Sequence, residues 1–416
     1  MAKIRKVQKK SAKLIVSTQG TISSKNIKSP MLIPPIEEKP SAAPIYPIIT
    51  VSSNFSGDID VVEDILDFSS PIFSNEQILV YQSELGLFPT EGPGEILKSN
   101  DYIQLHLDEI EKDMDSIIPD KDFEGFAIIG YEGWSLLWHR AEESYQEAWI
   151  LSWEEENPDL TAKWKEEGEE IYWTNIAATY NRTCKAFYTA TIQQCKTLRP
   201  KAKWGFFQRV FRNVLPDGTD VKVAQADNQD ISWLFENSDF VCPTLLTPFE
   251  SVADSETPNS SQQTFSDRKN VALSVLMDSK VIAEEYGIPV IPFLWVKHNG
   301  SQYSNYESYL SDLTMEATFE AIGESLVDGV FVWDSINDEA EATTFTGYMD
   351  ASFIPTVENR WVEVYNYKKL VISPKVEING GYITSDTSSL IFNSEENEVK
   401  VSIPWSSVDE IKSLES

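Results

Sequence analysis

The chain has 416 residues, of which 41% are hydrophobic and 12% aromatic, and its formal net charge is −32 at pH 7. This composition supplies a large core and excludes a globally disordered chain, and the length suits one domain of roughly 250 to 330 residues with appendages. Because the charge repels nucleic acid and anionic membranes, the acidic body is not expected to bind either of them.

The first 30 residues differ from the rest of the chain, since they hold eight basic residues and no acidic residue. A proline-rich stretch follows, and residues 1–45 show no helical or strand periodicity. This pattern predicts a basic, extended N-terminal arm and linker, with the arm as a candidate docking segment for an assembly partner. A solvated, disordered end is the alternative interpretation.

Residues 46–344 alternate short apolar runs with longer helical patterns. The predicted strands span 47–53, 77–82, 125–131, 203–211, 240–246, 289–297 and 329–335, and the predicted helices span 101–117, 138–155, 160–198, 262–286 and 314–327. Alternating strands and helices predict a parallel sheet of the α/β class. About seven strands that are apolar nearly throughout favour a closed, TIM-like β/α barrel over an open sheet with edges. No Gly-rich phosphate loop follows the first strand, which disfavours a dinucleotide-binding fold.

Residues 345–416 change to short strand-like runs separated by Asn, Gly, Ser and Pro, which predicts a small C-terminal antiparallel β module. The three cysteines are an odd number and too few for a disulfide framework, so buried thiols are expected. The three histidines have no Cys or carboxylate partners at metal-ligand spacing. The sequence therefore predicts no metal site and no cofactor.

Candidate catalytic positions lie where the predicted strands end, because the reactive side chains of a parallel barrel sit at the carboxyl ends of its strands. Gly130 and Glu132 stand at one such end, and alternate residues of a strand share a face, so both are expected to point the same way. Phe207, Leu246 and Trp333 occupy the corresponding positions of other strands. A carboxylate such as Glu132 is a functional candidate there, and a hydrogen-bonded structural carboxylate is the alternative.

The segment FEGFAIIGYEGW, residues 123–134, resembles the catalytic strand of the hyaluronidase family of glycoside hydrolases. In that family the strand carries a glycine and apolar residues, followed by Asp, an aromatic residue, Glu, any residue and Trp. The resemblance continues in chain order through ILVYQSELGLFP, LRPKAKWGFF, DISWLFENSDFVCPT, GIPVIPFLWVKH and LTMEATFEAIGESLVDGVFVWDS. It therefore covers residues 45 to 340, approximately.

The resemblance implies a barrel enzyme that cleaves a polysaccharide at an N-acetylhexosamine by substrate-assisted catalysis, so the implied partner is a polysaccharide containing N-acetylhexosamine. Glu132 matches the family's proton donor, and Trp333 matches a tryptophan that lines the sugar subsite. Further candidate substrate-binding residues beside these motifs are Tyr131, Trp134, Phe207 and Ser335.

The chain departs from the family pattern at four polar positions. The Asp that orients the reacting acetamido group is Gly130, the Arg after the motif's Trp is Ser135, and two active-site tyrosines are Phe207 and Leu246. The loss of one preorganised electrostatic partner costs about 3 to 4 kcal/mol in the transition state. Several such losses predict a catalytically impaired protein that acts as a glycan-recognition or structural component.

An active endo-N-acetylhexosaminidase is the alternative, with Glu132 as general acid in a rearranged site. Asp334 follows Trp333 where the family has a small residue. Its carboxylate would complete an acid and base pair if it approached Glu132 to roughly 5 to 10 Å. A capping or surface role is the other interpretation of Asp334.

The start of the chain predicts no secretory signal, because its short apolar run, Leu14 to Val16, falls below the roughly 7 to 15 apolar residues that a signal needs. No segment approaches the roughly 18 uncharged apolar residues of a membrane span. A protein that is cytoplasmic at synthesis is therefore expected. Incorporation into a virus or phage particle through the basic arm is a hypothesis that would explain the missing signal.

Overall fold

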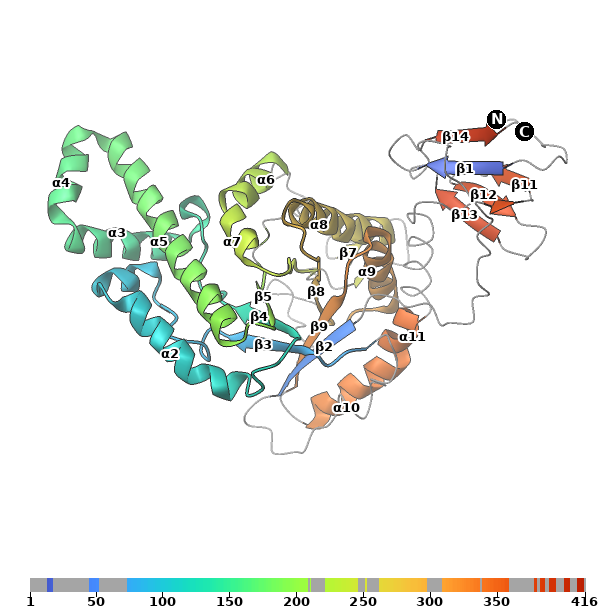
Figure 1. The fold of residues 1–416 in the computed structure, drawn as a ribbon, viewed down its shortest axis with the longest axis horizontal. Coiled ribbons are helices and arrows are strands. Elements are labelled where there is room, and N and C mark those ends of the chain that lie inside the picture. The colour runs from blue at the N-terminus through green and yellow to red at the C-terminus, as the bar shows by residue number, and fades with distance from the viewer. Residues whose placement is uncertain are drawn as a thin grey trace. The chain divides into compact units, whose positions relative to one another are not determined.

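The structure, a computed structural model, describes the following parts of the chain: residues 45–51, 73–208, 210, 221–245, 251–252, 262–297, 309–336 and 339–358, and the strand segments 13–17, 378–379, 382–385, 389–393, 400–404 and 410–414. The chain divides into two compact units, residues 43–361 and residues 1–42 with 362–416 (Figure 1). Residues 345–357, which the sequence assigned to the C-terminal module, are helical and belong to the larger unit. This unit therefore extends beyond the predicted boundary at residue 344.

The larger unit is built on parallel strands, as the alternating pattern predicts. They are β2 (Ile45–Val51), β3 (Gln77–Tyr81), β4 (Phe126–Gly130), β5 (Lys203–Phe206), β8 (Phe293–Trp295) and β9 (Val330–Ile336), and they form two three-stranded sheets in the orders β2-β9-β8 and β3-β4-β5. Single parallel bridges extend these pairings at Ile45–Phe73, Phe207–Cys242, Val241–Val290 and Thr244–Phe293. The segment around 241–244 thus pairs with β5 on one side and with the start of the β8 run on the other.

Helices surround these strands (Figure 1). They are α2 (Tyr102–Ile117), α3 (Glu143–Glu156), α4 (Pro158–Glu167), α5 (Glu169–Leu198), α6 (Val221–Asp230), α7 (Ser232–Asn237), α8 (Phe265–Tyr286), α9 (Asp312–Ser325), α10 (Glu339–Tyr348) and α11 (Ile354–Thr356), with short 3-10 turns η2 (Pro93–Lys98) and η3 (Trp138–Arg140) and a π-helical turn η4 (Met349–Phe353). Local signals set several ends. The Thr264 hydroxyl accepts a hydrogen bond from the Asp267 N–H and caps α8, which ends at Gly287 with φ +67°.

The single helix predicted over 160–198 is two helices in the structure. Gly168 separates α4 from α5 with φ +134°, a conformation that residues with a Cβ rarely adopt. Helices α3 and α4 and the first half of α5 extend away from the strands as an arm (Figure 1). The chain therefore reverses direction within a pattern that reads as continuous in the sequence.

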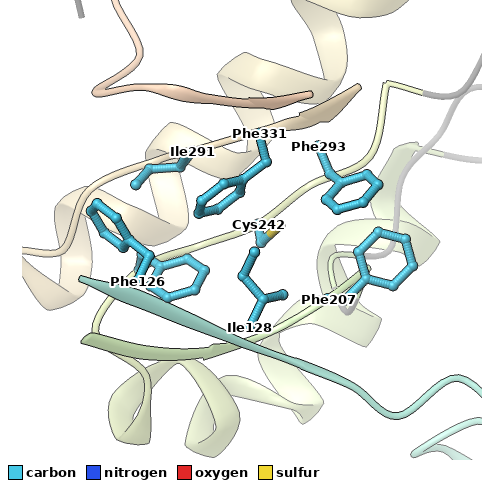
Figure 2. Close-up of a cluster of buried hydrophobic side chains, with 8 residues drawn as sticks. Phe126, Ile128, Phe207, Cys242, Ile291, Phe293 and Phe331 are labelled. Atoms are coloured by element: carbon cyan, nitrogen blue, oxygen red, sulfur yellow. The ribbon is translucent and has the colours of Figure 1, made fainter. Parts of the chain in front are cut away.

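The core inside the strands is aromatic. It consists of Phe126, Ile128, Phe207, Phe240, Cys242, Ile291, Phe293 and Phe331. Figure 2 shows the labelled members of this cluster turned toward one another. The rings of Phe126, Phe240 and Phe331 lie 5.4 to 5.8 Å apart at angles of 62° to 87°, the edge-to-face geometry that aromatic pairs prefer. Alternate residues of each strand point into this core. The next inward-pointing residue of each strand therefore lies above the core, at the carboxyl end of the strand.

A buried histidine fixes the loop after β3. The His106 Nδ1 accepts a hydrogen bond from the Leu87 N–H at 2.9 Å, and its Nε2 lies 2.9 Å from the Thr191 hydroxyl. Gly86 has φ +67°, and a Cβ there would lie only 2.5 Å from the same ring nitrogen. The ring therefore holds the loop that supports the end of β4, and burial lowers the pKa of His106 to about 4.

We expect the free energy of unfolding to fall by about 3 kcal/mol between pH 7 and pH 4 because of His106. In the unfolded chain the ring binds a proton near its ordinary pKa of 6.5, whereas the buried ring binds it only near pH 4. The unfolded state therefore binds more protons in this window, and acid favours it. Urea unfolding of the wild type and of His106→Gln at both pH values measures the effect. Equal pH dependence in the two proteins would contradict it.

The smaller unit contains two antiparallel sheets of three strands each. The first has the order β10 (Ile378–Asn379), β1 (Lys13–Ser17), β14 (Glu410–Leu414), and the second has the order β11 (Tyr382–Ser385), β12 (Ser389–Asn393), β13 (Lys400–Pro404). Part of the predicted N-terminal arm is therefore a strand that pairs with the end of the chain. The rest of the basic arm lies outside the described residues. Within the described ranges, no helix combines the length and apolarity that crossing a membrane requires.

Candidate functional site

A cavity of about 190 Å³ lies where the carboxyl ends of the strands converge. It is lined by Leu79, Tyr81, Glu132, Phe207, Gln208, Phe293, Trp295 and Trp333. Phe207 and Phe293 also belong to the aromatic core, so the cavity opens directly above that core. A mainly aromatic lining with a few polar groups is typical of a ligand site.

Two tryptophans form the wall of the cavity. Trp295 and Trp333 are paired in register between β8 and β9, and their rings lie 5.2 Å apart at 62°. The Trp333 Nε1 donates a hydrogen bond to the Tyr81 hydroxyl at 3.2 Å, which connects β9 with β3. The centres of the Trp333 and Phe293 rings lie 6.3 Å apart. These contacts fix the orientation of Trp333.

Glu132 is exposed and lies two residues beyond Gly130, the last residue of β4. The Gln82 Oε1 accepts hydrogen bonds from the Glu132 N–H at 3.2 Å and the Gly133 N–H at 3.1 Å. Gln82 thus holds the turn that presents Glu132 to the cavity. Among the described residues of the lining, Glu132 is the one carboxylate.

Gly130 adopts an ordinary backbone conformation, since it is absent from the glycines with positive φ in the described chain. A Cβ at this position would lie 3.4 Å from the Leu79 Cδ1 and 3.4 Å from the Val80 carbonyl oxygen, which is normal van der Waals contact. The backbone therefore does not require glycine here. The side chain of Leu79 borders the space that a side chain at position 130 would enter.

Asp334 lies behind the wall of the cavity, and its carboxylate is directed to buried donors. It is fully buried and forms an ion pair with the Lys297 Nζ at 3.0 Å. It also accepts hydrogen bonds from the Trp295 Nε1 at 3.2 Å, the Tyr309 hydroxyl at 3.1 Å and the Ser335 N–H at 2.9 Å. Burial and then the charge of Asp334 raise the pKa of Tyr309 well above its usual value, so this phenol keeps its proton and donates. Asp334 is not among the residues that line the cavity with Glu132.

Tyr131 and Trp134 are placed behind the cavity, in the packing between β4, α5 and the 85–89 loop. Tyr131 is fully buried, and its hydroxyl donates to the Leu85 carbonyl at 2.5 Å. Trp134 is 2% exposed, donates from Nε1 to the Pro89 carbonyl at 2.9 Å and stacks on Phe88. Neither residue lines the cavity that contains Glu132.

The remaining predicted site residues lie in different places relative to the cavity. Phe207 lines the cavity, as does Trp333. Ser335 is half-buried outside the lining, and its carbonyl accepts a hydrogen bond from the Lys297 Nζ at 3.3 Å. The Ser135 hydroxyl accepts a hydrogen bond from the Leu137 N–H at 3.4 Å. Leu246 lies outside the described residues.

Tyr81 and Trp295 also line the site, although the sequence patterns did not single them out. Both are the last residues of their strands, β3 and β8. The rule that strand ends carry the site, applied to the predicted strands 77–82 and 289–297, leads to within one or two residues of them. The last residues of those predicted strands, Gln82 and Lys297, support the lining from neighbouring positions.

Parallel strands surrounded by helices, with an aromatic cavity and a carboxylate at the strand ends, are typical of glycoside hydrolases. The chain belongs to the hyaluronidase family, because the family model described as Hyaluronidase matches residues 53–363. The resemblance stated from the sequence is therefore confirmed.

Individual relatives agree with this assignment. A hyaluronidase of Polistes annularis is 25% identical over 300 residues, which are 66% of this chain and 75% of that protein. Hyaluronidase-1 of Sus scrofa is 23% identical over 322 residues, 73% of this chain and 69% of that protein. The crystal structure of bee venom hyaluronidase in complex with a hyaluronic acid tetramer matches with a TM-score of 0.59 at 20% identity, over 76% of this chain and 99% of that chain. The larger unit therefore has the fold of that hyaluronidase.

The expectation of a cytoplasmic protein carried in a virus or phage particle is wrong. The relatives are hyaluronidases of animals, among them Polistes annularis, Tabanus yao and Sus scrofa. A protein of the same fold comes from bee venom, which is a secreted fluid. The expectation rested on the composition near one end of the chain, which carries less weight than membership of this family.

Proposed function

We propose that this protein is a hyaluronidase-family barrel that binds a polysaccharide containing N-acetylhexosamine and whose hydrolytic step is impaired. One observation carries the proposal: the described lining of the cavity keeps the proton-donor position, Glu132, but offers no second carboxylate beside it. Gly130 stands where the family pattern has an Asp. The site thus retains a surface for a sugar and lacks part of the chemistry.

The strand pairings support a closed frame for this site. The two sheets are joined by the bridge at Ile45–Phe73 on one side and by the bridges at Phe207–Cys242 and Thr244–Phe293 on the other. With 241–244 as an additional strand, these pairings support the proposal of a barrel of seven parallel strands. A cavity at the carboxyl ends is the position at which such barrels bind substrate.

The aromatic wall supports glycan binding. Trp295, Trp333 and Phe293 present flat apolar rings to the cavity, and Tyr81 and Gln208 add hydrogen-bonding groups at its edge. This combination suits a sugar, which has apolar C–H faces and a polar rim. A hyaluronidase of the same fold has been crystallised with a hyaluronic acid tetramer, a polymer that contains N-acetylhexosamine.

The impaired step follows from the chemistry of substrate assistance. Glu132 would protonate the leaving oxygen, but the reacting acetamido group also needs a carboxylate that orients and stabilises it. Loss of one such partner removes about 3 to 4 kcal/mol of transition-state stabilisation, or a factor of about 10² to 10³ in rate. Asp334 does not replace it, because its carboxylate is paired with Lys297 and three further donors.

An active endo-N-acetylhexosaminidase, with Glu132 as general acid in a rearranged site, is the second candidate function. The exposed position of Glu132 at the cavity favours it, and the Tyr81 hydroxyl lies in the same lining. The two candidates differ in turnover and agree in glycan binding. A comparison with a variant that lacks only the proton donor therefore separates them.

The test is to incubate the full chain and Glu132→Gln with hyaluronan, chondroitin and uncharged N-acetylglucosamine oligomers. Calorimetry measures binding, and a reducing-end assay measures cleavage. We expect both proteins to bind the same glycan with similar affinity and to release no reducing ends. Cleavage by the wild type that Glu132→Gln lacks would establish the active enzyme, and no binding to any of these glycans would overturn the glycan-recognition function.

A further inference from the structure

We propose that the buried Lys297–Asp334 ion pair positions the aromatic wall of the cavity, by holding the Trp295 indole in the orientation that meets the glycan. The inference rests on the proposed glycan binding. In this role Asp334 is a positioning residue that acts through a tryptophan, and it is neither a general acid nor a general base.

The Asp334 carboxylate is saturated with donors. Its Oδ1 lies 3.0 Å from the Lys297 Nζ and accepts hydrogen bonds from the Trp295 Nε1 at 3.2 Å and the Ser335 N–H at 2.9 Å. Its Oδ2 accepts from the Tyr309 hydroxyl at 3.1 Å. An ionised carboxylate accepts about four hydrogen bonds, so these donors occupy it. Such a group holds its neighbours in place and has little capacity left for proton transfer.

Both charges of the pair are buried and have partners. Asp334 is 0% exposed and Lys297 is 6% exposed. The Lys297 ammonium also donates to the Ser335 carbonyl at 3.3 Å and lies 5.1 Å from the centre of the Tyr309 ring. Buried ion pairs are often no more stabilising than apolar residues of the same volume, and fixing one specific arrangement is a role that they fill in some proteins.

The ion pair is connected directly to the cavity through Trp295. The indole whose N–H points at Asp334 belongs to Trp295, a residue of the lining. Its ring contacts Trp333 at 5.2 Å, and Trp333 in turn donates to Tyr81. A change at Asp334 therefore reaches two tryptophans of the wall through one hydrogen bond and one ring contact.

The experiment compares Asp334→Asn with a matched control, Asp227→Asn. Asp227 is also a buried aspartate, 3% exposed, and it pairs with Arg140 and His139 outside the lining of the cavity. The indole N–H signals of the ¹⁵N-labelled protein are recorded by NMR, and the Trp295 signal is identified by its loss in Trp295→Phe. We expect Asp334→Asn to shift and broaden the Trp295 signal and to shift the Trp333 signal, whereas Asp227→Asn leaves both unchanged. An unchanged Trp295 signal in folded Asp334→Asn would overturn the proposal.

Glycan affinity adds a readout that a merely structural role would not move. With the glycan that binds the wild type most tightly, we expect about a tenfold loss in Asp334→Asn, a step of about 1.4 kcal/mol, and none in Asp227→Asn. In the Trp295→Phe background, Asp334→Asn should weaken binding far less than tenfold, because the N–H on which it acts is gone. An equal loss in both backgrounds would contradict an action through Trp295.

A second variant keeps the test decisive if the first does not fold. If Asp334→Asn does not fold, Lys297→Gln/Asp334→Asn takes its place, since it removes both charges together and leaves neither unpaired. If the wild type binds none of the glycans, the proposed function fails. The NMR comparison still decides whether Asp334 positions Trp295.

Discussion

We expect Gly130→Asp to raise the rate of glycan cleavage by at least about 100-fold over the wild type. The substitution returns a carboxylate to the strand face that Glu132 continues, where it would orient the acetamido group of the sugar. The local structure accepts the change, because a Cβ at this position meets Leu79 Cδ1 and the Val80 carbonyl at 3.4 Å. Reducing-end release from the glycan that binds most tightly measures the effect.

Gly130→Asn is the control for this experiment, since it has the same size without the charge and should remain inactive. Gly130→Asp/Glu132→Gln should also be inactive, because the proton donor is then missing. Failure of folded Gly130→Asp to cleave, with binding retained, would mean that Ser135, Phe207 or Leu246 limits the chemistry instead. The missing carboxylate would then not be the main cause of the impairment.

We expect Asp334→Ala to lower the free energy of unfolding by about 3 to 5 kcal/mol, since breaking a buried ion pair leaves an uncompensated charge. Lys297 would remain buried with its charge, and the Trp295 N–H and the Tyr309 hydroxyl would lose their acceptor. Chemical denaturation of the wild type and of Asp334→Ala measures the difference in the free energy of unfolding.

Two further variants separate the cost of leaving one buried charge unpaired from the net contribution of the ion pair to the free energy of unfolding. Lys297→Met/Asp334→Leu removes both charges and should recover the part of the loss that comes from the unpaired charge, whereas the Trp295 N–H and the Tyr309 hydroxyl still lack their acceptor. Asp115→Ala removes an exposed partner of Arg199 and should cost much less than Asp334→Ala, because solvent screens the exposed carboxylate. A cost for Asp334→Ala as small as that for Asp115→Ala would contradict the ion pair as described.

The strands of the larger unit were predictable because each is a short apolar run, and β3, β4 and β9 fall within a residue or two of the predicted ranges. Helices α6 and α7 were missed, since α6 is short and largely polar and shows no apolar stripe. The break at Gly168 was missed because the residues on both sides share one helical pattern. Its positive φ becomes visible only in the structure.

For the site, the sequence located Glu132, Phe207 and Trp333, which do line one cavity. Their chain neighbours Tyr131 and Asp334 do not line it, because successive side chains of a strand point to opposite faces. Proximity to a motif in the sequence was therefore a poor guide to proximity in space.

The other walls of the cavity come from strands far apart in the chain. Trp295 meets Trp333 through the register of β8 on β9, and Tyr81 meets Trp333 across 252 residues. The register between strands that lie so far apart in the chain depends on the packing of the whole unit.

The most direct test of the central claim is the fate of one oligosaccharide mixed with an equal amount of the protein. The oligosaccharide that binds most tightly is incubated with the wild type and analysed by mass spectrometry, which detects even a single turnover. We predict that it is recovered at full length, bound and uncleaved. Shorter fragments that the Glu132→Gln protein does not produce would contradict the account.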